Sequence, residues 1–393
     1  MAAGAPSATA DSACADYKIC VTSPHYGTDV SGQVTIDFTA PGMKNGDVRI
    51  WHQPDATHTD KWGYDRWTEA IPAADGTASA TIDADDYPSG PMVVEISVWD
   101  SPPGDNSYTH SDNVYLSLFN TGGVDWSVGA TDTPGQAAGL TLSYDDEFTG
   151  PLSISRTGVG TTYASATPYQ SGGGEFGDAV FAEAGSANDP FTVKSSQYLR
   201  IRGQKAPDGF VDPQGWGRTY TSGFLASMGT DGQGFAASDA YFEARILMPG
   251  GYGTWPSFWV MGKNRITNGT SAPYTELDAV EQHGQSVSMK RTSQSTHCWA
   301  CTPVVHDTHV QSTFAHGLDA GRTWHTYGVR VAGNEVNYYI DGEKIDTYYP
   351  ADSSAHQPLF FMLDLAMGSG WPIDLSQQEN KADMYVDYVR VWS

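Results

Sequence analysis

The sequence has few basic residues. Its 393 residues include 21 Lys and Arg against 46 Asp and Glu, which gives a net charge of −25 at pH 7. No basic cluster offsets this charge, and phosphate backbones and anionic membrane surfaces repel such a protein. We therefore expect neither a nucleic acid nor a membrane as partner, and the charge favours a neutral ligand.

Long apolar runs and cysteines are scarce as well. No segment approaches the roughly 18 apolar residues of a transmembrane helix, and the first residues lack the basic and apolar regions of a signal peptide. The only cysteines form two close pairs, Cys14/Cys20 and Cys298/Cys301. This spacing predicts two local disulfides and an oxidising compartment. We expect a secreted protein, with the signal peptide absent from this sequence.

Helical periodicity is also missing over any stretch long enough to organise a domain. Charged residues make up only 17 % of the chain, whereas aromatic residues reach 12 %, with 43 glycines and 12 tryptophans. This composition is typical of strands joined by turns. The sequence therefore predicts an all-β protein, and its length suggests two domains.

The segments in which apolar and polar residues alternate, and those in which they do not, divide the chain into four parts. Residues 1–13 are rich in Ala and Ser and are expected to be disordered. Short alternating segments within 14–120 predict a smaller β-sandwich accessory domain, and residues 85–100 resemble bacterial immunoglobulin-like modules. Residues 121–139 have the composition of a linker, and strand patterns resume in 140–393, which predicts a larger antiparallel sandwich.

The first domain carries four tryptophans that allow two interpretations. In the first interpretation they form a carbohydrate-binding face, because a pyranose ring presents an apolar flank to an aromatic plane. Alternatively, one or two of them pack in the sandwich core and the others lie at its rim, and this second interpretation is favoured. The residues are Trp51, Trp62, Trp67 and Trp99.

Carboxylates are concentrated in the stretch 274–283. On a strand, residues two apart share a face, so Glu276 and Asp278 project together. Glu281 points to the other face unless one extra residue near Ala279–Val280 forms a β-bulge. With this bulge the two glutamate carboxyls come to about 5–6 Å, near the separation of retaining glycoside hydrolysis. The competing interpretations are a solvated strand and a calcium-binding loop.

Asp278 is expected to change the pKa of the glutamates beside it. A third negative charge raises the pKa of a neighbouring carboxyl. One glutamate is then protonated and able to act as an acid, while the other is ionised and able to act as a nucleophile.

Segments of the second domain resemble glycoside hydrolase family 16 in their order along the chain. The resemblance spans about residues 140–393 and implies a concave β-jelly-roll that cleaves β-linked polysaccharides with retention. The bulged E-x-D-x-x-E pattern is the one of laminarinase-like, agarase-like and carrageenase-like members. The matching segments are 146–148, 241–245, 255–259, 276–281, 324–327, 339–342 and 384–392.

Carried over by position, the resemblance implies roles for the three acids. Glu276 corresponds to the nucleophile, Asp278 to the supporting acid and Glu281 to the general acid/base. The phase argument pairs the same two glutamates.

The resemblance also implies substrate-binding residues. Trp255 and Trp259 on the preceding strand would stack on sugars, with core packing as the alternative for Trp259. His297 comes where such enzymes often place a histidine on the strand after the acids, although a lone histidine is often structural. Trp371 lies in a glycine-rich segment like the loop that borders the cleft of the family.

A structural calcium ion on the convex face is a further implication, with Glu147 and Asp387 as oxygen ligands. Ordinary turn and strand-end hydrogen bonds are the alternative for both. The chain departs from the family at Phe224, where relatives often carry a basic residue, and over the segment 283–309.

That segment contains two cysteines followed by two histidines. Cys298 and Cys301 with His306 and His309 have the residue types of a zinc site. A Cys298–Cys301 disulfide is the competing interpretation, and a secreted β-sandwich favours it.

These patterns together predict a monomeric, retaining, endo-acting glycoside hydrolase. Its expected substrate is a β-linked polysaccharide, namely a β-1,3-glucan, a galactan or a bacterial exopolysaccharide. No cofactor is expected for catalysis. The alternatives are a transglycosylase and a non-hydrolytic polysaccharide-binding protein on the same fold.

Overall fold

The structure is a computed structural model. It describes residues 14–51, 64–123, 133–169, 175–269, 272–284, 291–301, 305–312, 319–350 and 356–393, with the backbone alone over 64–67 and 305–312. The expected disorder of residues 1–13, the central part of the expected linker at 124–132, and Trp62 lie outside the described residues. The same holds for the side chain of Trp67.

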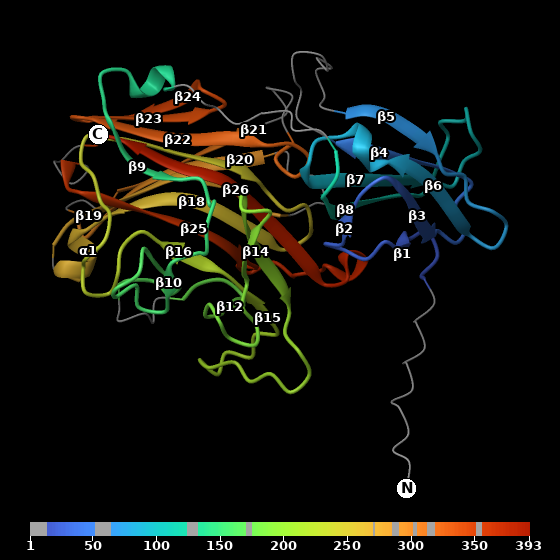
Figure 1. Cartoon of the computed structure of the whole chain (residues 1–393), viewed down its shortest axis with the longest axis horizontal. Helices are drawn as coiled ribbons and strands as arrows, with labels where there is room; N and C mark the ends of the chain where they lie inside the picture. Colours follow the sequence, from blue (N-terminus) through green and yellow to red (C-terminus); the bar gives the residue numbers. More distant parts are fainter. Residues whose placement is uncertain are drawn as a thin grey trace, which may run out of the picture.

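The first domain is a sandwich of two sheets, drawn from blue to cyan in Figure 1. Strand β3 shows why these segments form strands, since Val34, Ile36 and Phe38 are buried and alternate with more exposed residues. One sheet has the order β1 (Cys20–Ser23), β3 (Gln33–Thr39), β6 (Thr77–Asp83). The other has the order β2 (Asp29–Val30), β8 (Ser111–Asn120), β7 (Gly90–Trp99), β4 (Asn45–Trp51), β5 (Tyr64–Glu69).

The second domain is a larger sandwich of an eight-stranded and a ten-stranded sheet. The eight-stranded sheet has the order β10 (Ile154–Ser155), β11 (Tyr163–Ala164), β16 (Phe224–Ala226), β25 (Leu359–Met367), β18 (Thr254–Gly262), β19 (Tyr274–Glu281), β20 (Arg291–Trp299), β21 (Val305–Ser312). Each of the central strands β25, β18, β19 and β20 pairs antiparallel with its neighbours.

The ten-stranded sheet covers the other side of the core. Its order is β12 (Ala179–Phe181), β15 (Tyr220–Ser222), β14 (Tyr198–Lys205), β26 (Lys381–Trp392), β17 (Tyr241–Leu247), β22 (His325–Ala332), β23 (Glu335–Ile340), β24 (Glu343–Tyr348). Strand β13 (Phe191–Lys194) pairs with β14, and β9 (Leu142–Asp146) pairs with β26.

Helix is rare among the described residues. It is confined to α1 (Asn264–Thr267) and to 3₁₀ turns such as Ala84–Asp86, Gly135–Ala137 and Ser376–Gln378. The prediction of an all-β protein is therefore confirmed. In the described part of the chain, no helix is long and apolar enough to cross a membrane.

The core of the second domain lies between its two sheets. Phe242 and Ile246 of β17 belong to the same buried cluster as Phe258 and Val260 of β18, and all four are fully buried. Burial of each such side chain contributes about 1.5–3 kcal/mol. This core therefore supports the eight-stranded sheet, which carries the acidic stretch.

The two domains pack against each other through an aromatic interface. The outer face of the five-stranded sheet meets the ends of β14, β17, β22 and β26, and Figure 1 shows the two sandwiches side by side. The buried cluster at this junction, here called the interdomain cluster, consists of Trp51, Val93, Tyr115, Phe119, Tyr198, Leu247, Trp324 and Tyr385.

Trp51 lies inside this cluster and is only 6 % exposed. Its indole Nε1 donates a hydrogen bond to Glu95 at 2.6 Å, and the Arg322 guanidinium of the second domain lies over the ring at 4.1 Å. Trp51 therefore cannot belong to a carbohydrate-binding face, and the interpretation that placed it there is wrong. An alternating strand gave no sign that its outer face would be covered by another domain.

The Cys14–Cys20 disulfide joins the segment before β1 to the strand itself. Asp112 of β8 accepts hydrogen bonds from the backbone N–H of Ile19 at 2.9 Å and from Gln377 of the second domain at 2.5 Å. The start of the described chain is thus attached to both domains.

Candidate active site

Strand β19 carries the predicted bulge. On its β20 side, Asp278 lies opposite Ser295 and Glu281 opposite Ser293, so three steps along β19 match two along β20. On its β18 side the same irregularity separates Asp278 from Val280. Ala279 is the extra residue, and the bulge predicted at Ala279–Val280 is confirmed.

The bulge brings the three acids to one cavity. Without it, Glu281 would project into the core between the sheets, where Leu277, Ala279 and Val280 are fully buried. With it, the cavity of about 170 Å³ on the eight-stranded sheet is lined by Tyr169, Phe176, Trp255, Ser257, Trp259, Glu276, Asp278, Glu281 and Asp364.

Each glutamate is held by side chains of neighbouring strands. The Trp299 indole Nε1 donates to Glu276 Oε2 at 3.1 Å. The Trp255 indole Nε1 donates to Glu281 Oε1 at 3.1 Å, and the Ser295 hydroxyl donates to Glu281 Oε2 at 3.2 Å. The two carboxyls therefore have fixed orientations before any substrate binds.

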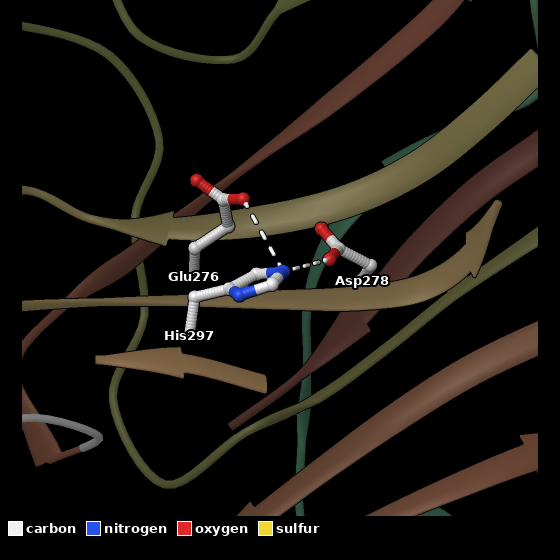
Figure 2. Close-up of side chains that lie close together, drawn as sticks. All are labelled: Glu276, Asp278 and His297. Carbon is white, nitrogen blue, oxygen red and sulfur yellow. Dashed lines mark ion pairs between the residues drawn. The ribbon is translucent and has the colours of Figure 1, made fainter. Parts of the chain in front are cut away.

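His297 approaches the acids from β20, as Figure 2 shows. Its Nε2 lies 3.3 Å from Asp278 Oδ2 and 4.0 Å from Glu276 Oε1. These three side chains are also the only group of potential metal ligands found among the described residues. The imidazole ring lies close to both acids, so His297 is part of the acidic group and is not only a structural residue of the core.

Burial governs the electrostatics of this group. Burial, followed by repulsion from Asp278, raises the pKa of Glu276 to about 8, while the nearby His297 and the hydrogen bond from Trp299 oppose the rise. Burial and the charge of Glu281 raise the pKa of Asp278 well above its usual range. The acids therefore share protons near neutral pH, because the site cannot hold all of their charges.

The raised pKa of Glu276 predicts how the free energy of unfolding depends on pH. Between pH 4.5 and about 8, folded Glu276 keeps a proton that the unfolded chain has released. The free energy of unfolding therefore falls as the pH rises through this window. We expect Glu276→Gln to gain on the order of 2 kcal/mol over the wild type at pH 8 and nothing at pH 4.

Urea unfolding at pH 4 and pH 8 measures this difference. The matched control is Glu183→Gln, whose carboxylate is half exposed in a surface ion pair with Arg156, and which should change stability by less than about 1 kcal/mol at either pH. Equal stability of Glu276→Gln and the wild type at pH 8 would rule out a buried Glu276 that keeps its proton up to this pH.

Asp364 is a fourth acid that the sequence interpretation missed. It is fully buried on β25, and its oxygens accept from the Trp259 indole at 2.7 Å and from the Ala366 N–H at 3.0 Å. Burial raises its pKa to about 8. A lone carboxylate in an otherwise apolar strand, Leu359–Met367, was the available sign.

Trp259 is itself mostly buried, with 6 % of its surface exposed, and belongs to a second apolar cluster below the cavity. Trp255 is half-buried, so it is more exposed than Trp259. Phe176 lies 5.6 Å from the Trp255 ring and 6.0 Å from the Trp259 ring. The glycine-rich sequence around Phe176 gave no sign of this position.

Trp371 lies beside the same group. Its ring is 5.9 Å from that of Trp255 and 5.3 Å from that of His283. The structure thus brings Trp255 and Trp371 together with the acids, and adds His283.

Cys298 and Cys301 are joined by a disulfide, as predicted. Their thiols are therefore not zinc ligands, and the zinc interpretation is wrong. The side chains of His306 and His309 lie outside the described residues.

Glu147 and Asp387 each have an arginine partner. Arg390 Nε donates to Glu147 at 2.7 Å, and Arg245 Nη1 donates to Asp387 at 2.6 Å. A calcium ion would have to displace these guanidinium groups, so the residues present fit the predicted ion poorly. Calcium binding at these two acids stays a prediction.

Comparison with known families gives the decisive match. The model of glycosyl hydrolases family 16 matches residues 192–390, about half of the chain. The chain belongs to glycosyl hydrolase family 16. The match covers most strands of both sheets of the second domain, including the acids of β19.

Curated relatives of this family-16 chain are distant. The endo-1,3-1,4-beta-glycanase EglC of Rhizobium meliloti is 29 % identical over 294 residues, which cover 72 % of this chain and 58 % of the relative. The endo-1,3-1,4-beta-glycanase ExsH of the same organism is 30 % identical over 208 residues, covering 52 % and 40 %. The chain thus spans about half the length of these relatives.

Solved family-16 structures share the fold. The laminarinase catalytic domain from Thermotoga maritima superposes with a TM-score of 0.50 at 21 % identity, covering 65 % of this chain and 98 % of that one. SCLam, a non-specific endo-beta-1,3(4)-glucanase, gives 0.52 at 19 %, covering 67 % and 94 %. The predicted β-jelly-roll is therefore confirmed for the second domain.

Proposed function

We propose that this family-16 protein is a retaining, endo-acting hydrolase of β-linked polysaccharides, of the bulged E-x-D-x-x-E type. The observation that carries the proposal is the bulge at Ala279, which places Glu281 beside Glu276 and Asp278 in one cavity. Two fixed carboxyls on one face, with indoles next to them, suit acid-assisted cleavage of a glycosidic bond.

In the proposed mechanism Glu281 donates its proton to the glycosidic oxygen while Glu276 attacks the anomeric carbon. The bond to the leaving sugar breaks, and a glycosyl ester forms on Glu276. Glu281, now ionised, removes a proton from water, and the water oxygen attacks the same carbon and releases Glu276. The Trp255 and Ser295 hydrogen bonds hold Glu281 in place for both steps.

Glu276 must be ionised to attack. Glu276 holds a proton below about pH 8, so we infer that this proton passes to Asp278, which is 4 % exposed and whose pKa is also raised, when the reactive form arises. The Trp299 hydrogen bond and nearby His297 then favour the charged form of Glu276. Protonated Asp278 then adds no negative charge beside the nucleophile. His297 acts as a positioning residue through its contact with Asp278.

The names of the relatives guide the choice of substrate. EglC and ExsH are named endo-1,3-1,4-beta-glycanases, and another relative, from Niallia circulans, is named glucan endo-1,3-beta-glucosidase A1. We infer a β-glucan with 1,3 linkages as substrate. Galactans and bacterial exopolysaccharides remain the alternatives, since the segment 283–309 departs from the laminarinase pattern.

A panel of polysaccharides tests this choice. We expect reducing ends to appear fastest with mixed-linkage β-1,3-1,4-glucan or β-1,3-glucan, and products of intermediate length to appear first, as endo cleavage requires. With a defined oligosaccharide as substrate, products longer than that oligosaccharide would identify a transglycosylase instead. Binding without any new reducing ends on the whole panel would identify the non-hydrolytic alternative.

The setting of the protein completes the proposal. Two disulfides suit an oxidising compartment, which supports secretion. We also infer a monomer. We infer an immunoglobulin-like accessory domain from residues 20–120, because they form a sandwich of two sheets.

A further inference from the structure

A second hollow lies away from the acids, on the first domain. A cavity of about 390 Å³ opens over the outer face of the five-stranded sheet, beside the loop that contains Tyr108. A neighbouring cavity of about 370 Å³ reaches the second domain at Tyr252 and Gln377. Trp99 lines both cavities. The two together, here called the furrow, cross the boundary between the domains.

Strand alternation explains the floor of the furrow. In β7, Val94, Ile96 and Val98 face the sandwich core, so Trp99 projects outward with Asp47 and Arg49 of β4. One part of this outer face is covered by the interdomain cluster. The remaining part is the furrow, so docking of the domains leaves a polar and aromatic strip open to solvent.

Three aromatic side chains mark the furrow along its length. Tyr108 and Tyr252 are 48 % and 47 % exposed, and half-buried Trp99 forms a wall of both cavities between them. Flat, partly exposed rings suit stacking against the apolar flank of a pyranose. Tyr252 precedes Trp255 of the candidate active site by three residues.

The charges of the furrow favour a neutral ligand. Arg49 is paired with Asp47 at 3.1 Å, and Lys18 is paired with Asp112 at 3.1 Å. The other charged residues of the lining are Glu69 and Asp105. Carboxylates outnumber cations, so an acidic polysaccharide would be repelled, whereas a neutral glycan finds hydrogen-bonding groups beside the rings.

The furrow is also held rigidly beside the catalytic domain. Gln377 donates to Asp112 at 2.5 Å and to the carbonyl of Ile19 at 3.2 Å. Gln378 donates to the carbonyls of Tyr115 and Gly250, both at 3.0 Å. These contacts fix the segment before Tyr252 against β8, so a ligand meets a preformed surface.

We propose that the furrow is a second polysaccharide-binding site, which takes a segment of neutral β-linked glycan outside the active site. Its choice of ligand rests on the proposed function. Tyr108, Trp99 and Tyr252 stack on successive parts of the chain. Because the interface fixes the domains, the furrow keeps a bound polysaccharide close to the acids and raises its local concentration there.

Affinity electrophoresis of the full chain in gels that contain mixed-linkage β-1,3-1,4-glucan or β-1,3-glucan tests the furrow. All variants carry Glu276→Gln, so that the gel polysaccharide is not degraded. We expect Trp99→Ala to weaken retardation about 10-fold and Tyr108→Ala about 3-fold, since aromatic contacts contribute about 0.5–1.5 kcal/mol each and Trp99 has the larger ring. Trp99→Phe should restore part of the binding, and Trp216→Ala, at an exposed tryptophan elsewhere, should bind like its parent.

A second measurement separates the furrow from the active site. With Glu276 intact, Trp99→Ala should hydrolyse a short β-glucan oligosaccharide at the wild-type rate and show a higher KM only on the polymer. Trp99-dependent retardation without hydrolysis would support the furrow and refute the hydrolase. Hydrolysis with equal retardation of Trp99→Ala, Tyr108→Ala and their parent would overturn the furrow and keep the hydrolase.

Discussion

Glu276→Gln and Glu281→Gln should each lower the rate of polysaccharide hydrolysis by about 10³-fold or more. Each change keeps the size of the side chain and removes the ability to attack or to carry a proton. Reducing-end release from the best substrate of the panel measures the effect. Glu183→Gln, at a half-exposed ion pair, is the control and should retain full activity.

The roles of the two glutamates can be separated with an aryl glycoside. An aryl leaving group of low pKa needs no protonation, so Glu281→Gln should still release it in a rapid first turnover and then stall as the glycosyl ester. Glu276→Gln should show no such burst. Near-normal steady-state hydrolysis by either variant, with folding verified by circular dichroism, would remove that glutamate from the mechanism.

Trp51→Ala should lower the free energy of unfolding by about 3–5 kcal/mol. The change leaves a cavity in the interdomain cluster, removes the hydrogen bond to Glu95 and takes the ring away from the Arg322 guanidinium. We also expect the two domains to lose their coupling. Calorimetry should show one cooperative transition for the wild type and two for the variant.

Trp216→Ala is the matched control for this experiment. Trp216 is 59 % exposed on a loop, and its removal should cost less than about 1 kcal/mol and leave one transition. If Trp51→Ala still unfolds in a single transition at the wild-type temperature, the aromatic interface does not couple the domains.

The sequence predicted the active-site strand well because both determinants are local. The face on which Glu276 and Asp278 project follows from the period of a strand, and the odd offset of Glu281 demanded a bulge, which the register with β18 and β20 contains. The disulfides followed in the same way from short spacings. Patterns within about ten residues were sufficient for these features.

Features made by distant segments could not be predicted in this way. Phe176 reaches the cavity from a loop, and Asp364 reaches it from a strand about 85 residues after the acids. Trp51 gave the alternating pattern of a solvent-facing residue, although another domain covers it. In each case the partner surface, rather than the local pattern, determines what the residue contacts.

The bulge at Ala279 also bears on how such sites are recognised in other sequences. A strand without the bulge presents two glutamates on one face when they are four residues apart, whereas this strand does so with five. Loss of the codon for Ala279 would therefore shorten the motif and still leave both acids on the same face. Two homologous genes can thus differ by one codon in this motif and encode equivalent arrangements, and a motif search with fixed spacing would place them in separate groups.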